Sequence, residues 1–224
     1  MLSRCIADII LHTEGIIMVN FLLVRHGYSV SNRDGIFTGQ DDVALDSVGI
    51  EQAEELKEYV VKNYKIDCIY SSDLSRAVET VQPIANVINL PVNKVFDLRE
   101  ISIGDWEGIP IDKLQNTFGA EYDKFRREQG LYKFKNGESY YDGLQRSKKA
   151  LFEIANKNDE KNILIGTHGG IIRMIIAECL GIPYNKLNDV SEVCNCSVTH
   201  LHINGEIMKI GDIGYCKYIS KKTK

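Results

Sequence analysis

The sequence lacks the features that mark several special classes of protein. Its 224 residues include only 6 cysteines, too few for a disulfide-stapled domain, and only 4 prolines, too few for an extended or collagen-like chain. No apolar run reaches the ~18 residues of a membrane span. A large excess of one charge is also missing, since 27 basic and 31 acidic side chains give a formal net charge of -4. We therefore expect neither a general nucleic-acid binder nor an anionic-membrane binder.

The N-terminal segment lacks the uninterrupted apolar core of a signal peptide. Charged and polar residues break the apolar run within residues 1–18, and no small-x-small cleavage site follows. We treat residues 1–18 as an N-terminal extension of uncertain status and place a single domain at residues 19–224. Because the patterned sequence begins just after Met18, this methionine is an alternative start, a hypothesis that mass spectrometry of the native N-terminus tests.

What remains is the composition of an ordinary globular protein. Hydrophobic residues make up 44% and charged residues 26% of the chain, which is long enough to bury a core. Sparse cysteines without a C-x-x-C pair predict reduced, mostly buried thiols in a cytoplasmic protein. No internal repeat, low-complexity tract or linker divides the sequence, which favours one domain.

Strand-like and helix-like segments alternate along the chain. Short apolar runs predict strands at 19–24, 66–70, 95–98 and 163–165. Helical spacing of apolar residues predicts helices at 47–63, 74–88, 120–129, 140–157 and 171–180. Asp46 or Ser47 can cap the first helix and Asp73 the second. Asn204-Gly205 predicts a hairpin between runs at 197–203 and 207–210. This order predicts an α/β fold with a mostly parallel central sheet, helices on both faces and an antiparallel edge.

The segment 101–140 is too irregular and too long for a plain connection, which favours a lid or a binding segment. Basic residues within it would favour a substrate with a second anionic group: Arg126, Arg127, Lys133 and Lys135. Aromatic residues within it would serve either internal packing or contact with an apolar substrate: Trp106, Tyr122, Phe125, Tyr132 and Phe134.

Functional side chains follow the predicted strands, where open α/β sheets form their sites. Arg25-His26-Gly27 follows the first strand, Arg76 lies one turn into the helix after the second, Glu100 follows the third, and His168-Gly169 follows the fourth. Because the carboxyl ends of parallel strands share one edge, we expect these residues to converge. Any one of them alone is more typical of a structural residue than of a catalytic one.

The expected cluster has the chemistry of an oxyanion site. Arg25 and Arg76 can bind phosphate oxygens in pairs and stay charged at any working pH. Glycines beside both histidines allow main-chain N–H groups to approach a ligand, and the N-terminus of the helix at 171–180 favours an anion. Imidazole can act as a nucleophile toward phosphorus. The residues therefore predict covalent catalysis through a phosphohistidine.

The segment LLVRHGYSVSN (22–32) resembles the R-H-G-x-[ST]-x-x-N signature of the histidine phosphatase superfamily, in its phosphoglycerate mutase-like branch. The resemblance continues through segments 37–53, 70–84, 98–108, 137–146, 166–170 and 194–201, in the order typical of the family. It therefore spans nearly the whole chain from residue 19 and implies the phosphoglycerate mutase-like fold. Tyr28 and Thr167 depart from the residues frequent in the family, without removing a catalytic group.

The resemblance implies a role for each matching residue. His26 would be the phosphorylated nucleophile, Arg25 and Arg76 would bind the transferring phosphoryl group, and His168 would stabilise its charge. Glu100 would protonate the leaving alkoxide and then activate water. Further contacts with the substrate or its phosphate would come from Ser29, Asn32, Thr38, Gly39 and Gly169. No metal or other cofactor is implied.

A phosphomonoester hydrolase acting on a small phosphorylated metabolite is the expected function. The sequence after Glu100, ISIGDWEG, resembles the broad phosphatase branch rather than the mutases, which carry a different motif and a long insertion there. A phosphoglycerate mutase is the main alternative. We expect no nucleic-acid or membrane partner, and the oligomeric state stays open between monomer and homodimer.

Two further classes are weaker. A non-catalytic phosphoryl-binding module would normally have lost the nucleophile, the second histidine or the glutamate, and all three are present. A metalloenzyme would need more than the H-x-H pair at 200–202 and the C-x-C pair at 194–196. These pairs are more typical of ordinary strand and loop residues.

Overall fold

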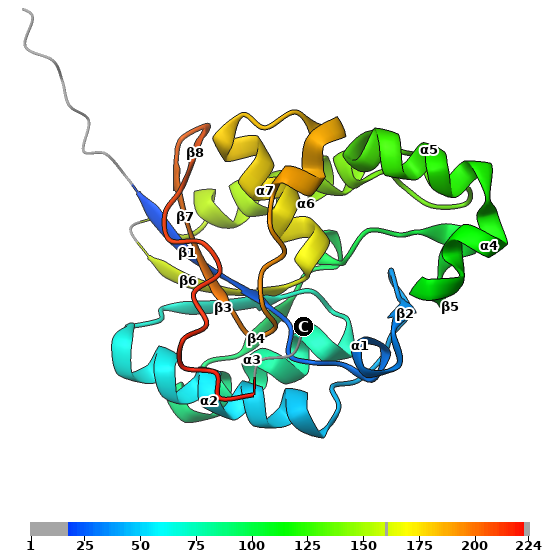
Figure 1. Cartoon of the computed structure of the whole chain (residues 1–224). Coiled ribbons are helices and arrows are strands. Elements are labelled where there is room, and N and C mark those ends of the chain that lie inside the picture. Colours follow the sequence, from blue (N-terminus) through cyan, green and yellow to red (C-terminus); the bar gives the residue numbers. More distant parts are fainter. Residues whose placement is uncertain (1–17, 160, 222–224) are drawn as a thin grey trace, which may run out of the picture.

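A computed structural model describes residues 18–159 and 161–221 (Figure 1). Its centre is a six-stranded sheet in the order β4-β3-β6-β1-β7-β8. The strands are β1 (Val19–Arg25), β3 (Cys68–Ser71), β4 (Val92–Lys94), β6 (Asn162–Thr167), β7 (Val198–Asn204) and β8 (Ile207–Ile210). The first four in that order are parallel. Strand β7 pairs antiparallel with β1, and β8 pairs antiparallel with β7. The predicted fold class is confirmed. The expectations about residues 1–17 lie outside the described residues.

Helices cover both faces of the sheet (Figure 1). They are α2 (Ser47–Asn63) and α3 (Ser75–Ile88) on one face and α6 (Tyr140–Asn156) and α7 (Gly169–Leu180) on the other. Successive side chains of a strand point to opposite faces, and β1 shows this directly. Phe21 and Leu23 join one buried core, and Leu22 and Val24 join the other. The central strand is buried on both sides, as its unbroken apolar run predicts.

The helices α2 and α3 begin differently. Asp46 caps α2, because its Oδ1 accepts hydrogen bonds from the N–H groups of Val48 and Gly49 at 2.8 and 3.0 Å. The predicted cap by Asp73 is wrong: α3 begins after Leu74 without a side-chain cap. Asp73 instead accepts two parallel bonds from Arg99 at 2.7 Å, and this pairing lowers the pKa of its carboxyl. A charge-assisted bidentate pair is stronger than a single cap bond.

The strand predicted at 95–98 is also misplaced. The edge strand β4 ends at Lys94, and a 3-10 helix, η1 (Phe96–Leu98), follows. Its neighbour β3 ends at Ser71, whose carbonyl accepts the last ladder bond from Val95 at 2.8 Å. Because β3 ends at this point, the segment after β4 has no strand left to pair with and turns inward. There Thr167 Oγ1 donates to the carbonyl of Leu98 at 2.9 Å. This turn brings the following residue pair, Arg99-Glu100, to the sheet edge.

The irregular segment 101–140 forms a side lobe next to the edge where the parallel strands end (Figure 1). It contains η2 (Gly104–Trp106), β5 (Ile109–Pro110), η3 (Ile111–Lys113), α4 (Leu114–Phe118), α5 (Ala120–Glu128) and η4 (Gln129–Leu131). Strand β5 pairs with β2 (Ile36–Phe37), which follows the short helix α1 (Val30–Asp34). The lobe is therefore joined to the loop that follows β1.

Most aromatic residues of this lobe pack against one another. Trp106 is 2% exposed and stacks on Phe118 with ring centroids 4.4 Å apart. Its ring also contacts Tyr122, Phe125, Tyr132 and Phe134. Of the two readings that the sequence left open, internal packing is the one observed. Two lysines of the lobe form surface ion pairs, Lys133 with Asp142 and Lys135 with Asp105.

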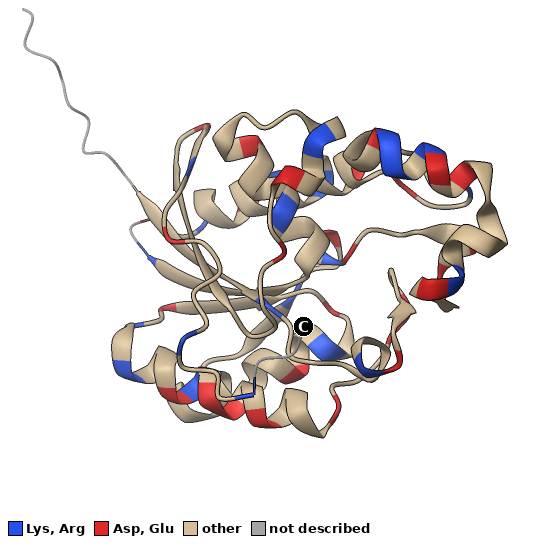
Figure 2. Cartoon of the chain, in the orientation of Figure 1, with Lys and Arg blue, Asp and Glu red and all other residues tan. Residues whose placement is uncertain are grey.

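Charged residues of both signs are spread over the helices (Figure 2). Lysine and arginine alternate with aspartate and glutamate along α5, and α2 is mainly acidic. Among the helices that the structure describes, none combines the length and the apolarity needed to cross a bilayer. A last 3-10 helix, η5 (Tyr184–Asp189), lies between α7 and the loop that leads into β7.

Candidate active site

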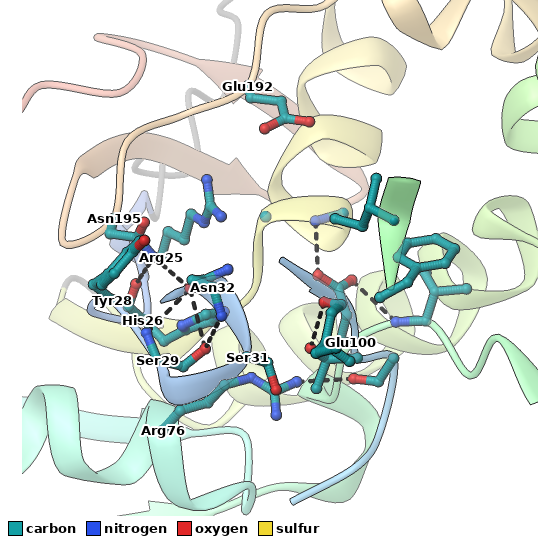
Figure 3. Close-up of a pocket in the computed structure, with 18 of the residues that line it drawn as sticks. Arg25, His26, Tyr28, Ser29, Ser31, Asn32, Arg76, Glu100, Glu192 and Asn195 are labelled. Atoms are coloured by element: carbon teal, nitrogen blue, oxygen red, sulfur yellow. Dashed lines mark hydrogen bonds between the residues drawn. The ribbon is translucent and has the colours of Figure 1, made fainter. Parts of the chain in front are cut away.

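A cavity of about 460 Å³ opens where β1, α3 and α7 meet, at the carboxyl ends of the parallel strands. Nine of the ten predicted site residues line it: Arg25, His26, Ser29, Asn32, Thr38, Gly39, Arg76, Glu100 and Gly169. The tenth, His168, is fully buried, with its ring centroid 5.3 Å from that of His26. In Figure 3, Glu100 lies across the pocket from Arg25 and His26.

The side chain of His26 is fixed in one tautomer. Its Nδ1 lies 2.8 Å from the carbonyl oxygen of Gly27, which can only accept a hydrogen bond. Nδ1 therefore carries the proton and Nε2 carries the free lone pair. Burial, together with the positive charges of Arg76 and Arg25, holds the pKa of His26 well below 6.5. The ring is thus neutral at neutral pH, as a nucleophile must be.

The loop of His26 is held tightly by its neighbours. The N–H of Gly27 donates to Thr80 Oγ1 on α3 at 2.8 Å, and Asn195 Nδ2 donates to the carbonyl of His26 at 2.8 Å. A Cβ atom at Gly27 would lie 2.8 Å from the carbonyl oxygen of Gly49 on α2. Glycine is required here because two main-chain segments approach closely.

Two arginines, the buried Arg76 and the partly buried Arg25, supply positive charge beside His26. Arg76 is 2% exposed, and its two terminal nitrogens donate to the carbonyls of Asp41 and Gly39 at 2.8 Å. Arg25 donates to the carbonyl of Val193 at 2.6 Å. Burial lowers the pKa of both guanidinium groups, and nearby acids, including Glu100, partly oppose the shift. Carbonyl oxygens fix the guanidinium groups without neutralising their charge, which stays available to an anion.

Main-chain N–H groups hold the carboxyl of Glu100, and two side chains hold its main-chain carbonyl. Its Oε2 accepts a hydrogen bond from the N–H of Gly170 at 2.9 Å, and its Oε1 from its neighbour Ile101 at 3.0 Å. Its own carbonyl accepts from Arg146 at 2.7 Å and from Gln40 at 2.9 Å. A Cβ atom at Gly170 would lie 2.5 Å from Oε1, so only glycine leaves room for the carboxyl group at the start of α7.

The ring of His168, like that of His26, is held by a hydrogen bond, but its partner is a side chain rather than a main-chain carbonyl. Its Nε2 lies 2.8 Å from Ser72 Oγ, at the end of β3. Burial, together with the charge of Arg76, keeps the pKa of His168 well below 6.5. His168 is therefore neutral at neutral pH and can act on an anion through an N–H dipole.

The remaining predicted residues shape the rim. Ser29 caps α1: its Oγ accepts from the N–H of Asn32 at 3.2 Å, and Asn32 Oδ1 accepts from the N–H of Ser29 at 3.1 Å. Thr38 Oγ1 donates to the carbonyl of Ile36 at 3.1 Å. Gly39 has φ +54° and offers its carbonyl to Arg76. Their direct contact with a phosphate stays a prediction.

Four further residues at the site were not predicted from the sequence. Tyr140, Arg173 and Glu192 line the cavity, and Ser72 contacts His168. Arg173 donates to the carbonyls of Leu187 and Val190 at 2.8 and 3.2 Å and lies 3.8 Å from Glu192. Ser72 directly follows a predicted strand, which was the available signal. Tyr140 lies within 137–146, a segment that resembles the family, whereas Arg173 and Glu192 lie on segments without a motif of their own.

The H-x-H pair of β7 is engaged in ordinary polar contacts. His200 Nε2 lies 3.1 Å from the hydroxyl of Tyr64, and His202 Nδ1 lies 2.8 Å from Asn20 Oδ1. Within residues 18–159 and 161–221, no three His, Cys, Asp or Glu side chains gather as a metal site would require. Cys68, Cys179, Cys194 and Cys196 are free thiols.

The fold and this geometry together define an α/β protein with a buried anion site around a neutral histidine. Comparison with known proteins agrees. The family described as the histidine phosphatase superfamily (branch 1) matches residues 21–213. A metal-independent phosphoserine phosphatase of Arabidopsis thaliana is 30% identical over 191 residues, which cover 84% of this chain and 78% of the relative.

Two more relatives support the same assignment. An adenosylcobalamin/alpha-ribazole phosphatase of Escherichia coli K12 is 29% identical, covering 72% of this chain and 79% of that protein. The solved structure of Bacillus stearothermophilus YhfR superposes with a TM-score of 0.84 at 27% identity, covering 90% of this chain and 100% of that one. The chain therefore belongs to the histidine phosphatase superfamily and is an enzyme of the phosphatase type.

Proposed function

We propose that the chain is a metal-independent phosphomonoester hydrolase that works through a phosphohistidine on His26. The observation that carries this proposal is the tautomer of His26. Its Nδ1 is bound to the carbonyl of Gly27, and the ring is neutral beside two arginines. Nε2 is therefore a free nucleophile next to a site that attracts a phosphate dianion.

In the first step, Nε2 of His26 attacks phosphorus while the bond from phosphorus to the alcohol oxygen breaks. Arg25, Arg76 and the N–H dipole of His168 stabilise the charge on the other three oxygens. Glu100, in its carboxylic acid form, gives its proton to the leaving oxygen. General acid catalysis of this kind contributes about 10²–10⁴-fold.

In the second step, water replaces the alcohol. The carboxylate of Glu100 takes a proton from water, the water oxygen attacks phosphorus, and the bond to Nε2 breaks. Inorganic phosphate leaves, and both His26 and Glu100 return to their starting forms. Over one cycle the phosphomonoester and water become an alcohol and phosphate.

The composition of the cavity wall favours hydrolysis over the mutase reaction. In the described part of the chain, its cationic side chains are Arg25, Arg76 and Arg173. Arg173 lies 3.8 Å from the carboxylate of Glu192, which offsets its charge. A phosphoglycerate mutase has to hold a second phosphate group, and among the described residues this cavity offers no further unpaired cation for it. The basic residues of the lobe do not supply one either, because Arg126, Arg127, Lys133 and Lys135 are not among its lining residues.

The rest of the wall suits a leaving group of moderate size. Apolar side chains also line it, including Ile36, Phe37, Ile103 and Ile111. The cavity of about 460 Å³ is much larger than a phosphate alone needs. We therefore propose a small phosphorylated metabolite as substrate, with phosphoserine as the first candidate because of the relative from Arabidopsis thaliana.

The test is phosphate release in the presence of EDTA. The purified chain is assayed with p-nitrophenyl phosphate, phosphoserine and 3-phosphoglycerate, and the last is also followed for conversion to 2-phosphoglycerate. Brief reaction with a ³²P-labelled substrate should give an acid-labile, base-stable phosphoenzyme. His26→Ala should lose turnover and label together, and His202→Ala, a histidine outside the cavity, should keep both.

Retained turnover in His26→Ala would exclude the proposed mechanism. Interconversion of the phosphoglycerates that outpaces phosphate release would identify a mutase instead. Loss of activity with EDTA, restored by a divalent metal, would contradict metal independence.

A further inference from the structure

A buried glutamine connects the His26 loop to the C-terminal part of the chain. The main-chain N–H of Tyr28 donates to Oε1 of Gln52 on α2 at 2.9 Å. Nε2 of the same side chain donates to the carbonyl of Lys221 at 2.8 Å. Gln52 is only 1% exposed. Both ends of its amide are thus satisfied by main-chain groups that are far apart in sequence.

Residues 214–221, which we call the C-terminal strap, are fastened along α2. The ring of Tyr218 stacks on Tyr59 with centroids 4.1 Å apart and planes 9° apart. The N–H of Ser220 donates to Glu55 Oε2 at 3.0 Å. Lys221 forms an ion pair with Glu51. The carbonyl that Gln52 binds is therefore held in place by contacts of the strap itself.

The same strap reaches the site by a second route. The hydroxyl of Tyr218 donates to the carbonyl of Cys196. The N–H of Cys196 in turn donates to the carbonyl of Arg25 at 2.9 Å. Arg25 and Tyr28 flank His26 on either side, so the strap constrains both ends of the loop that carries the nucleophile.

We propose that Gln52 is a positioning residue for His26 and that the C-terminal strap is part of the frame of the active site. Because in-line attack tolerates little displacement, a loop that drifts by an ångström loses much of its rate. Without Gln52, the buried N–H of Tyr28 loses its acceptor and the loop has to move to find another. This proposal rests on the proposed function only for its kinetic readout.

The kinetic test compares three variants. Gln52→Met keeps the size of the side chain and removes both hydrogen bonds. We expect its kcat to fall about tenfold or more, with KM within about twofold, because the arginines that bind phosphate are untouched. Gln52→Glu keeps an acceptor for Tyr28, and should retain a clearly higher kcat than Gln52→Met. Gln82→Met, a matched change at an exposed glutamine of α3, should behave as wild type.

Hydrogen exchange gives a readout that does not depend on activity. The amide of Tyr28 should exchange faster in Gln52→Met than in wild type, and close to the wild-type rate in Gln52→Glu. Truncation after Ile219 removes the carbonyl of Lys221 and should shift both readouts in the same direction, which covers the case in which Gln52→Met fails to fold.

The outcomes distinguish a failure of the proposed phosphatase function from a failure of the positioning role of Gln52. If the wild type hydrolyses no phosphomonoester, the proposed function fails, and exchange at Tyr28 still decides the link through Gln52. Unchanged exchange at Tyr28 in both Gln52→Met and the truncated chain would overturn the positioning role. So would a kcat of Gln52→Met equal to that of wild type, or a loss that appears only in KM.

Discussion

The hydroxyl oxygen of Ser72 lies 2.8 Å from Nε2 of His168, and this contact orients the ring of the second histidine. Ser72 Oγ also accepts the N–H of Leu74 at 3.3 Å, which leaves one lone pair and its own proton for His168. The hydroxyl proton goes to Nε2 when the neutral ring carries its own proton on Nδ1. This Nδ1 is buried and makes no hydrogen bond within the described residues. In that tautomer a phosphoryl oxygen would satisfy Nδ1, and we propose that the neutral imidazole stabilises an anion through this N–H.

Ser72→Ala should therefore lower kcat/KM by about tenfold or more, since the ring of His168 loses the contact that orients it, and a hydrogen bond to a charged group is worth about 1.5–3 kcal/mol. Steady-state kinetics with p-nitrophenyl phosphate measures the loss. Ser71→Ala is the matched control, because the adjacent hydroxyl is buried without contacting a histidine. Equal kinetics for Ser72→Ala and wild type would show that the contact between Ser72 and His168 does not matter for catalysis.

Substitutions at Glu100 and at Gly170 should both impair protonation of the leaving group. Glu100→Gln removes the acid, and we expect losses of about 10²–10⁴-fold with alkyl phosphates, whose alkoxides need a proton. The loss should be smaller with p-nitrophenyl phosphate, whose leaving group is stable as an anion. Gly170→Ala should show the same dependence in weaker form, because its Cβ would lie 2.5 Å from Glu100 Oε1. A loss independent of the leaving group would contradict the acid role.

The two buried histidines predict how stability depends on pH. Burial lowers the pKa of both His26 and His168 below 6.5, so they stay neutral in the folded protein while the unfolded chain takes up protons. Protons then favour the unfolded state. The free energy of unfolding should be independent of these groups above about pH 6.5 and should decrease below it, by up to about 1.4 kcal/mol per pH unit for each histidine.

Urea unfolding between about pH 7 and pH 5 measures this slope. Replacing one of the two histidines, as in His26→Gln, should remove the uptake of about one proton on unfolding and so reduce the slope by up to about 1.4 kcal/mol per pH unit. Acids such as Asp73, whose pKa is lowered by pairing with Arg99, lose their contribution only at lower pH. A slope unchanged by His26→Gln would mean that this ring is protonated in the folded state.

Substitutions at two apolar residues of the lobe should distinguish a side chain that contacts the substrate from one that only packs inside the lobe. Ile111 is 53% exposed and lines the cavity, so Ile111→Ser should raise KM for aryl phosphates more than for small alkyl phosphates. Trp106 is buried within the lobe, so Trp106→Ala should lower the stability of the protein by about 3–5 kcal/mol. Thermal unfolding and KM measured on both variants test the assignment. The reverse pattern would place the tryptophan, rather than the isoleucine, against the substrate.

Much of the fold and of the site follows from local sequence patterns. Alternating apolar runs and helical periods gave the α/β order, because strand and helix periods depend only on neighbouring residues. The misplaced strand at 95–98 shows the limit of such patterns. An edge strand stops where its neighbour β3 stops, at Ser71, and a run of side chains carries no information about that partner. Asp73 failed as a cap for the same reason, since Arg99 lies 26 residues away in sequence.

The sequence by itself determined which chemical groups this protein has at its strand ends: His26 and His168, Arg25 and Arg76, and Glu100. Their convergence followed from the rule that parallel strands end at one edge. Only the tertiary structure decided how these groups are set. The carbonyl of Gly27, the hydroxyl of Ser72 and the N–H of Gly170 fix the proton or the orientation of each side chain. Hydrogen bonds and burial depend on atoms that the fold brings together, and they determine charge state and tautomer where residue type alone cannot.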